Sequence, residues 1–230
     1  MARVVMSGLV TDLRGKLGGT VFQKNRWGLF GRNLVIPINR STADQEKVRE
    51  LHSHLCKLWG GLTRNQRSMW RETAKLYPEV RNGKTYVLTG FLFYMKLNRN
   101  LQEIGEPINT DVPRIEIPEA FTSFSVDIVT TPGTEDIKLN LSPAIDAQTK
   151  MRVYATFIVK NGVDFVKGKY CKIAVLDHTF VSGGSIKAEY IAKYGKMPAT
   201  GEKAFFHIRP TLTASGYDSY PLSCEGVGIV

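Results

Sequence analysis

Hydrophobic residues between positions 42 and 104 recur at the three- and four-residue spacing of amphipathic helices. Two such stretches fill residues 41–78 and are separated by a Gly-Gly pair at 60–61. A third stretch follows Thr89 and carries one apolar stripe: Phe91, Tyr94, Leu97, Leu101 and Ile104. The first two each begin with a capping-box pattern of threonine and, three residues later, glutamine: Thr42 with Gln45, and Thr63 with Gln66. The spacing therefore predicts an αα-hairpin and a third helix, which form a helical module at 41–105.

Residues 121–230 change to the alternating pattern of short β-strands, with Gly, Pro and Asn between the runs. The runs lie at 124–129, 137–141, 152–158, 170–176 and 204–208, and a last one ends at Val230. Six or seven strands in about 110 residues predict a β-sandwich of the immunoglobulin or fibronectin type III kind.

Two further segments of this half have no clear strand pattern. Residues 186–194 fit an edge strand or a crossover helix, and the helical spacing of Ile186, Tyr190 and Tyr194 favours a short helix. Residues 106–120 are stiffened by prolines, and we expect them to be a linker between the helical module and the sandwich at 121–230.

Residues 1–40 are rich in glycine and basic residues and contain only short β-type runs. Two of these runs, at 20–23 and 29–30, flank a turn and predict a β-hairpin. A hairpin with so few apolar side chains is only marginally stable alone in water. We therefore expect an extended basic arm that packs on the rest of the chain or on another molecule. The predicted fold class is α+β: a glycine-rich arm with a hairpin, a small helical module and an immunoglobulin- or fibronectin-III-like β-sandwich.

The composition is that of an ordinary globular protein, with 230 residues of which 43% are hydrophobic and 23% charged. It excludes collagen-like, low-complexity and fully disordered chains. No uninterrupted apolar run reaches the roughly 18–20 residues that a membrane helix needs. Residues 1–10 lack the charged start and long apolar stretch of a secretory signal. We therefore expect a soluble protein that is made in a reducing cytoplasm.

The net charge of +10 lies in the first half of the chain. Residues 1–105 hold 18 Lys and Arg against 7 Asp and Glu, a balance of +11, whereas residues 106–230 hold 13 against 14, a balance of −1. Such asymmetry is typical of two modules with different partners, and the basic one favours nucleic acid, a membrane surface or an acidic protein. The alternative is a solvated basic face, as in the helical stripe of Arg64, Arg67 and Arg71.

Residues that carry catalytic or metal chemistry are sparse. His52 and His54 are two apart on a predicted helix and point to different sides, so they do not predict a metal site. The glycine-rich stretch at 15–20 lacks the ending of a phosphate loop and precedes a strand rather than a helix. Cys171 and Cys224 lie near the spacing of an immunoglobulin bridge, but a reducing compartment favours two buried thiols. We therefore expect no enzyme, no metal ion and no cofactor.

Basic and aromatic residues interleave in the arm. This mixture suits the phosphates and bases of nucleic acid. It equally suits a loop that docks into an acidic groove on a protein, where Arg and Trp are preferred anchors. The residues that we expect to make the contacts are Arg14, Phe22, Arg26, Trp27, Phe30 and Arg32.

The first hundred residues resemble a family of uncharacterised phage and prophage proteins. The shared opening consists of Gly8, Asp12, Arg14, Gly15, Gly18, Gly19, Phe22, Asn25, Arg26 and Gly28. The family's next elements are matched by Pro37, Asn39, Thr42, Gln45, Val48, Arg49, Trp59, Leu62, Thr63, Gln66, Arg67, Trp70 and the run at 97–101. The resemblance covers most of residues 7–104, and Arg40 departs from it where the family has proline. It implies a virion component encoded among head and tail genes and brings no catalytic residue.

Together these patterns favour a structural component of a phage virion, a head decoration, head–tail connector or tail protein that locks into the assembly through its arm. The expected partners are capsid, connector or tail proteins and further copies of the chain, with nucleic acid secondary and no membrane. The alternative is a nucleic-acid-binding protein that uses the basic first half, with an affinity that falls steeply with salt. An enzyme would need a pocket with perturbed titratable groups in the sandwich.

Overall fold

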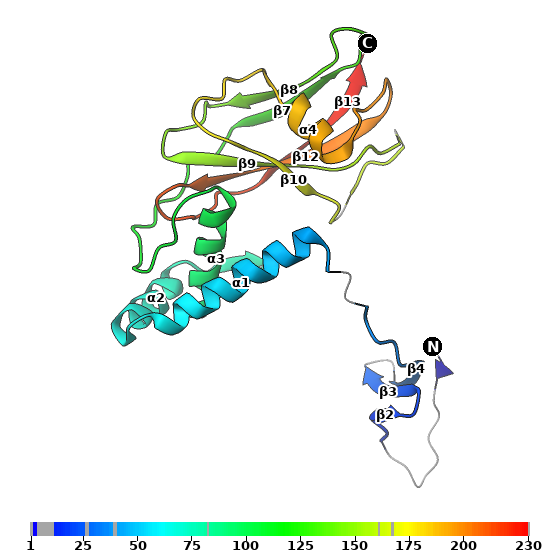
Figure 1. Ribbon diagram of the computed structural model, residues 1–230, viewed down its shortest axis with the longest axis vertical. Coiled ribbons are helices and arrows are strands. Elements are labelled where there is room, and N and C mark those ends of the chain that lie inside the picture. The colour runs from blue at the N-terminus through cyan, green and yellow to red at the C-terminus, as the bar shows by residue number, and fades with distance from the viewer. Residues whose placement is uncertain are drawn as a thin grey trace. The chain divides into compact units, whose positions relative to one another are not determined.

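The computed structural model describes residues 2–3, 12–25, 28–38, 41–81, 83–160, 162–166 and 168–229. They divide into two compact units, Met1–Lys47 and Val48–Val230, and the division falls inside helix α1 (Ala43–Gly61). The helices and the large sheet, which the sequence pattern assigns to separate domains, both belong to the second unit (Figure 1). Within the described residues, no helix has the length and apolar character needed to cross a membrane.

The first unit contains a four-stranded antiparallel sheet in the order β1-β4-β3-β2. Its strands are β1 (Ala2–Arg3), β2 (Gly15–Leu17), β3 (Thr20–Asn25) and β4 (Gly28–Asn33). β3 and β4 pair along their whole length, from Thr20 opposite Asn33 to Asn25 opposite Gly28. Gly18 has a φ of 57° in the tight turn between β2 and β3, a conformation that favours glycine.

Three helices form one layer of the second unit: α1, α2 (Arg64–Leu76) and α3 (Gly90–Glu103). The capping box predicted for α2 is confirmed, because the Thr63 hydroxyl accepts from the Gln66 N–H and the Gln66 side chain accepts from the Thr63 N–H. α2 and α3 cross closely at Gly90, where a Cβ atom would stand 2.7 Å from the backbone nitrogen of Arg71. The helices enclose a core of Leu55, Leu62, Trp70, Ala74, Phe93, Tyr94, Met95 and Leu97.

A short hairpin of β5 (Glu79–Arg81) and β6 (Lys84–Tyr86) connects α2 to α3. The segment after α3, which we expected to be a linker, has neither helix nor strand and lies against the helices. The Trp70 indole donates to the Thr110 carbonyl at 2.9 Å, and the Asn98 side chain accepts from the Asn109 N–H at 2.7 Å. These bonds fix the path of the chain from the helical layer to the sheet.

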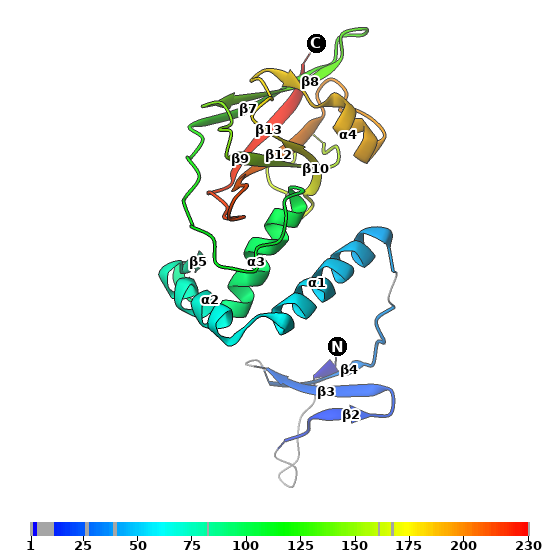
Figure 2. The same cartoon turned by 60° about the vertical axis from the view of Figure 1, so that its left-hand side comes forward.

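The second layer of this unit is a seven-stranded mixed sheet in the order β10-β9-β12-β13-β7-β8-β11. Its strands are β7 (Ser123–Val129), β8 (Asp136–Ser142), β9 (Thr149–Ala155), β10 (Cys171–Leu176), β11 (Gly184–Ser185), β12 (Lys203–Leu212) and β13 (Leu222–Ile229). The fold is therefore α+β, as predicted. The immunoglobulin- or fibronectin-type sandwich is not confirmed, because β13 pairs with β12 on one side and with β7 on the other and joins all strands into one curled sheet (Figure 2).

The short helix predicted at 186–194 is confirmed as α4 (Lys187–Tyr194). Its Tyr190 is buried against Phe206 of β12, with ring centroids 6.0 Å apart. The inner face of the curled sheet supplies the rest of this core from strands on both sides of β13: Val126, Ile128, Ile137, Leu139, Met151, Val153, Ala204, Phe206 and Ile208. The second unit therefore carries two hydrophobic cores, one among the helices and one inside the sheet.

Candidate assembly surface

The pairing register of the arm sheet sorts its side chains onto two faces, because residues directly opposite each other on neighbouring strands share a face. Phe22 lies opposite Gly15 on one side and Gly31 on the other, and Val21 lies opposite Lys16 and Arg32. The apolar face of the sheet carries Leu17, Phe22 and Leu29, with Thr20 and Lys24. The opposite, basic face carries Lys16, Val21, Gln23, Phe30 and Arg32.

Neither face is fully buried, although Val21, Phe22, Leu29 and Phe30 are half-buried. Gly31 is the one buried residue among 12–24 and 28–38, and Leu17 is 71% exposed. Phe22 is half-buried, because its ring lies over Gly31 with Cε1 3.4 Å from the position that a Cβ atom would take there. A sheet of this size needs a packed hydrophobic face to be stable, and the described part of the arm does not supply one.

An apolar segment continues the chain beyond β4. Its large side chains Leu34, Val35, Ile36 and Ile38 are 36%, 69%, 78% and 88% exposed. Exposed apolar side chains that follow one another in this way mark a contact site more often than isolated ones do. Together with the apolar face, this segment gives the arm a large area that a partner can bury.

Positive charge dominates the arm. Arg14, Lys16, Lys24 and Arg32 are exposed, and Asp12 is the single acidic residue among positions 1–40. Asp12 forms an ion pair with Arg14 at 2.9 Å. In the described part of the chain, Lys16, Lys24 and Arg32 have no carboxylate at ion-pair distance.

The register separates residues that the sequence pattern grouped as one contact set. Phe22 lies on the apolar face, whereas Phe30 and Arg32 lie on the basic face. Arg14 precedes β2 and is paired with Asp12. The predicted contacts of Arg26 and Trp27 lie outside the described residues.

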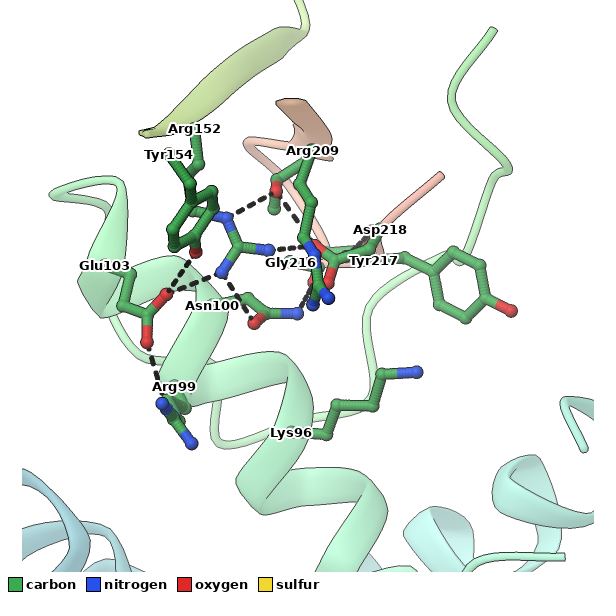
Figure 3. A network of polar contacts seen from close by, with 12 residues as sticks. Lys96, Arg99, Asn100, Glu103, Arg152, Tyr154, Arg209, Gly216, Tyr217 and Asp218 are labelled. Carbon is green, nitrogen blue, oxygen red and sulfur yellow. Dashed lines mark hydrogen bonds and ion pairs between the residues drawn. The ribbon is translucent and has the colours of Figure 1, made fainter. Parts of the chain in front are cut away.

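A cluster of polar side chains, which the sequence did not indicate, joins α3 to the sheet in the second unit (Figure 3). At its centre is Arg152 of β9, whose side chain is 2% exposed. Its Nη1 donates to Glu103 Oε2 at 2.6 Å and to Asn100 Oδ1 at 3.1 Å. Its Nη2 donates to Asp218 Oδ1 at 2.5 Å, and its Nε donates to Thr211 Oγ1 at 3.1 Å. The guanidinium is therefore bonded on all three nitrogens, which makes it a structural clamp rather than a site for a ligand.

The charges of this cluster stabilise one another. Burial works to raise the pKa of Glu103, but the adjacent guanidinium groups of Arg152 and Arg99 outweigh it and hold that pKa below its usual value. Burial works to lower the pKa of Arg152, and the negative charges around it hold the pKa above its usual value. Asn100 extends the cluster by donating to the Gly216 carbonyl at 2.9 Å. The last turn of α3 is thereby fixed to the sheet.

His207 lies beside the clamp, next to Tyr154 and Tyr170, with ring centroids 5.8 Å and 5.6 Å away. Its Nδ1 lies 2.9 Å from the Ser223 hydroxyl, and its Nε2 accepts from Arg209 Nε at 3.0 Å. Burial, followed by the positive charges of Arg209 and Arg152, lowers the pKa of His207 to about 4. The imidazole is therefore neutral and has both nitrogens occupied, unlike a general base that is poised near neutral pH.

The cysteines differ from expectation in one respect. Cys171 and Cys224 were expected to be buried, but Cys171 is exposed, because it lies on β10 at the edge of the sheet. Burial raises the pKa of the half-buried Cys224 thiol to about 12. In the described ranges, no three His, Cys, Asp or Glu side chains converge as metal ligands would.

An open hollow in the second unit is lined by polar residues that include Glu106, Lys150, Asp177 and His178. Lys150 and Glu106 form an ion pair at 2.7 Å, and Asp177 accepts from the backbone and hydroxyl of Thr179. Three of the charged groups that line the hollow are therefore already paired within the chain.

No protein-family model matches this chain, and no curated protein matches it. The resemblance to phage and prophage proteins therefore stays a prediction that rests on the residues quoted for it.

Proposed function

We propose that this chain is a structural component of a bacteriophage virion, a head decoration, head–tail connector or tail protein, and that it locks into the particle through its N-terminal arm. The observation that carries the proposal is the exposed apolar surface of the arm: Gly31 is the one buried residue among 12–24 and 28–38, and Leu17, Val35, Ile36 and Ile38 are largely exposed. The resemblance of residues 7–104 to phage and prophage proteins supports the same conclusion from the sequence. The proposal assigns the chain a role in assembly and no catalytic step.

The physical reason is the missing core of the arm. Full burial of a large aliphatic or aromatic side chain contributes about 1.5–3 kcal/mol. Leu17, Val35, Ile36 and Ile38 are each more than two-thirds exposed, so most of this contribution is still to be gained. A neighbouring virion protein, or a further copy of the chain, that covers these side chains stabilises the sheet and the complex together. In a symmetric particle the same contact is repeated at every copy.

The second unit has a different role in this proposal. It is a compact unit with two hydrophobic cores and the Arg152 clamp, and we expect it to fold without the partner. We propose that its curled sheet faces outward from the particle or contacts a second protein. The arm would then attach the second unit to the particle.

The direct test is quantitative mass spectrometry of gradient-purified particles from the culture that carries the gene, before and after removal of tails. A peptide signal that scales with the major capsid protein would place the chain on the shell. A smaller signal that follows the tail fraction would make it a connector or tail protein. Absence from the particles would overturn the proposal.

A paired set of variants tests the role of the arm itself. Leu17→Ser with Ile36→Ser removes two exposed apolar side chains of the arm, whereas Val181→Ser with Tyr220→Ser removes two from the second unit that are 76% and 83% exposed. The first pair is expected to abolish incorporation into particles, and the second pair to leave it unchanged. Equal incorporation of both pairs would contradict attachment through the arm.

A further inference from the structure

The basic face of the arm sheet has a composition that the assembly role does not require. Lys16 on β2 and Arg32 on β4 stand opposite Val21 in one row across three strands. The next row contains Gln23, whose side-chain oxygen accepts from Arg32 Nε at 3.3 Å, and Phe30. Two cations, the amide of Gln23 and the ring of Phe30 therefore lie together on the face opposite the apolar one.

The spacing of the two cations indicates what kind of anion they fit. Neighbouring strands lie about 4.8 Å apart, so the backbones that carry Lys16 and Arg32 are separated by roughly 10 Å. An acidic protein surface would need carboxylates placed to match both cations. A nucleic-acid backbone, with one negative charge for about every 1.7 Å of duplex axis, provides phosphates to both at once.

The surroundings of the face also favour a polyanion. Arg14 is paired with Asp12, but Lys16 and Arg32 have no carboxylate within ion-pair distance among the described residues. Both cations are exposed on the sheet surface, where they can contact phosphates, and contacts to phosphates carry no direct sequence information. Phe30 offers a ring against which a base or sugar can pack.

We propose that the basic face of the arm sheet binds the sugar–phosphate backbone of nucleic acid without sequence preference. Lys16 and Arg32 contact phosphates, and Gln23 orients the Arg32 guanidinium. Because the apolar face lies on the other side of the sheet, a protein and a nucleic acid can occupy the arm at the same time. The inference does not depend on where the chain is located in a particle.

The test uses the full chain and fluorescence anisotropy with a labelled 30-base-pair duplex and its single strand, between 50 and 200 mM salt. Each phosphate contact contributes a slope of about −0.9 to the plot of log affinity against log salt for duplex DNA. The Lys16→Gln, Arg32→Gln double variant is therefore expected to reduce the magnitude of the slope by about 2 and to lower the affinity at every salt concentration.

A matched control variant loses the same two positive charges at positions outside the arm. Lys138→Gln with Lys169→Gln removes two exposed lysines of the second unit and is expected to leave the slope within error of the unaltered chain. Equal losses in the two double variants would overturn the proposal, since binding would then follow net charge and not this face. Absence of binding by the unaltered chain at 100 mM salt would also overturn it and would point to an acidic protein. Neither result would alter the particle measurement, so the two proposals fail independently.

Discussion

Nη1 of Arg152 lies 2.6 Å from Oε2 of Glu103, and this ion pair joins β9 to the last turn of α3. Glu103 also accepts from Arg99 at 3.0 Å, so one carboxylate connects a buried guanidinium with an exposed one. The pair belongs to the charged cluster around Arg152, which links the helical layer to the sheet within the second unit. The connection between the layers therefore depends on electrostatics as well as on apolar packing.

Replacing Arg152 tests this dependence. Arg152→Met removes the guanidinium and leaves Glu103 and Asp218 without their buried partner, which is expected to lower the free energy of unfolding by about 3–5 kcal/mol. Urea denaturation followed by fluorescence measures the change. The control is Arg99→Gln, whose side chain is 58% exposed and whose loss is expected to cost less than about 1 kcal/mol. Equal effects of the two variants would show that the clamp does not hold the layers.

The titration of His207 is a second prediction. Because the pKa of this imidazole is lowered from 6.5 to about 4, the folded protein resists protonation that the unfolded chain accepts. The neutral imidazole therefore supports stability above pH 6.5, and this contribution is lost as the pH falls from about 6.5 to about 4. A pH titration of the imidazole proton signals by NMR measures the pKa of His207 directly. A midpoint near 6.5 would mean that the ring is neither desolvated nor close to Arg209.

The crossing of α2 and α3 leads to a third prediction. A Cβ atom on Gly90 would stand 2.7 Å from the Arg71 nitrogen and 2.8 Å from its Cα, so Gly90→Ala must push the helices apart. We expect a loss of about 1–3 kcal/mol in thermal or urea unfolding. The matched control is Gly60→Ala in α1, where nothing besides the adjacent residues and the backbone of the helix itself lies within 4 Å of the added carbon. That variant is expected to be neutral or stabilising by up to about 1 kcal/mol, and a loss of equal size there would contradict the explanation from helix crossing.

Removal of residues 1–40 separates the arm from the rest of the chain. The deletion keeps Thr42, which accepts from the Gln45 N–H at the start of α1, and both cores of the second unit. The shortened chain is expected to unfold in one cooperative transition with a Tm within about 4 °C of the full chain, measured by calorimetry. Loss of that transition would mean that the arm is part of a core and does not depend on another molecule for its burial.

Local patterns in the sequence predicted the local structure well. Thr63 and Gln66 are three residues apart and fix the start of α2 by themselves, and the spacing of Ile186, Tyr190 and Tyr194 was enough to identify α4. Such features need no information about distant parts of the chain. The same holds for the third helix, whose stripe of Tyr94, Leu97 and Leu101 is buried as predicted.

Long-range relations were not predictable in the same way. The partners of Arg152 lie 49 to 66 residues away along the chain, on α3, β12 and the loop that follows it. In the sequence, Arg152 alternates with Met151 and Val153 and reads as an ordinary outward residue of a strand. The parallel pairing of β13 with β7 was equally hidden, because periodicity identifies strands but not their neighbours. That pairing turns the expected two sheets into one.

The arm was predicted as a basic segment with a hairpin, but its two faces were not. The predicted runs at 20–23 and 29–30 placed Phe22 and Phe30 in strands, and only the register between β3 and β4 shows that these two side chains lie on opposite faces. Successive side chains of a strand alternate between the two faces of the sheet, so neighbouring apolar and basic residues of the arm lie on opposite faces. Composition alone could therefore nominate contact residues but could not divide them between two partners.

The central claim is that the arm sheet obtains its core from another molecule. Amide hydrogen exchange of β2, β3 and β4, measured by mass spectrometry in the isolated chain and in purified particles, tests this claim most directly. The claim predicts exchange within seconds in the isolated chain and protection increased by at least about 100-fold in the particle. Equal protection of these strands in the two samples would contradict it.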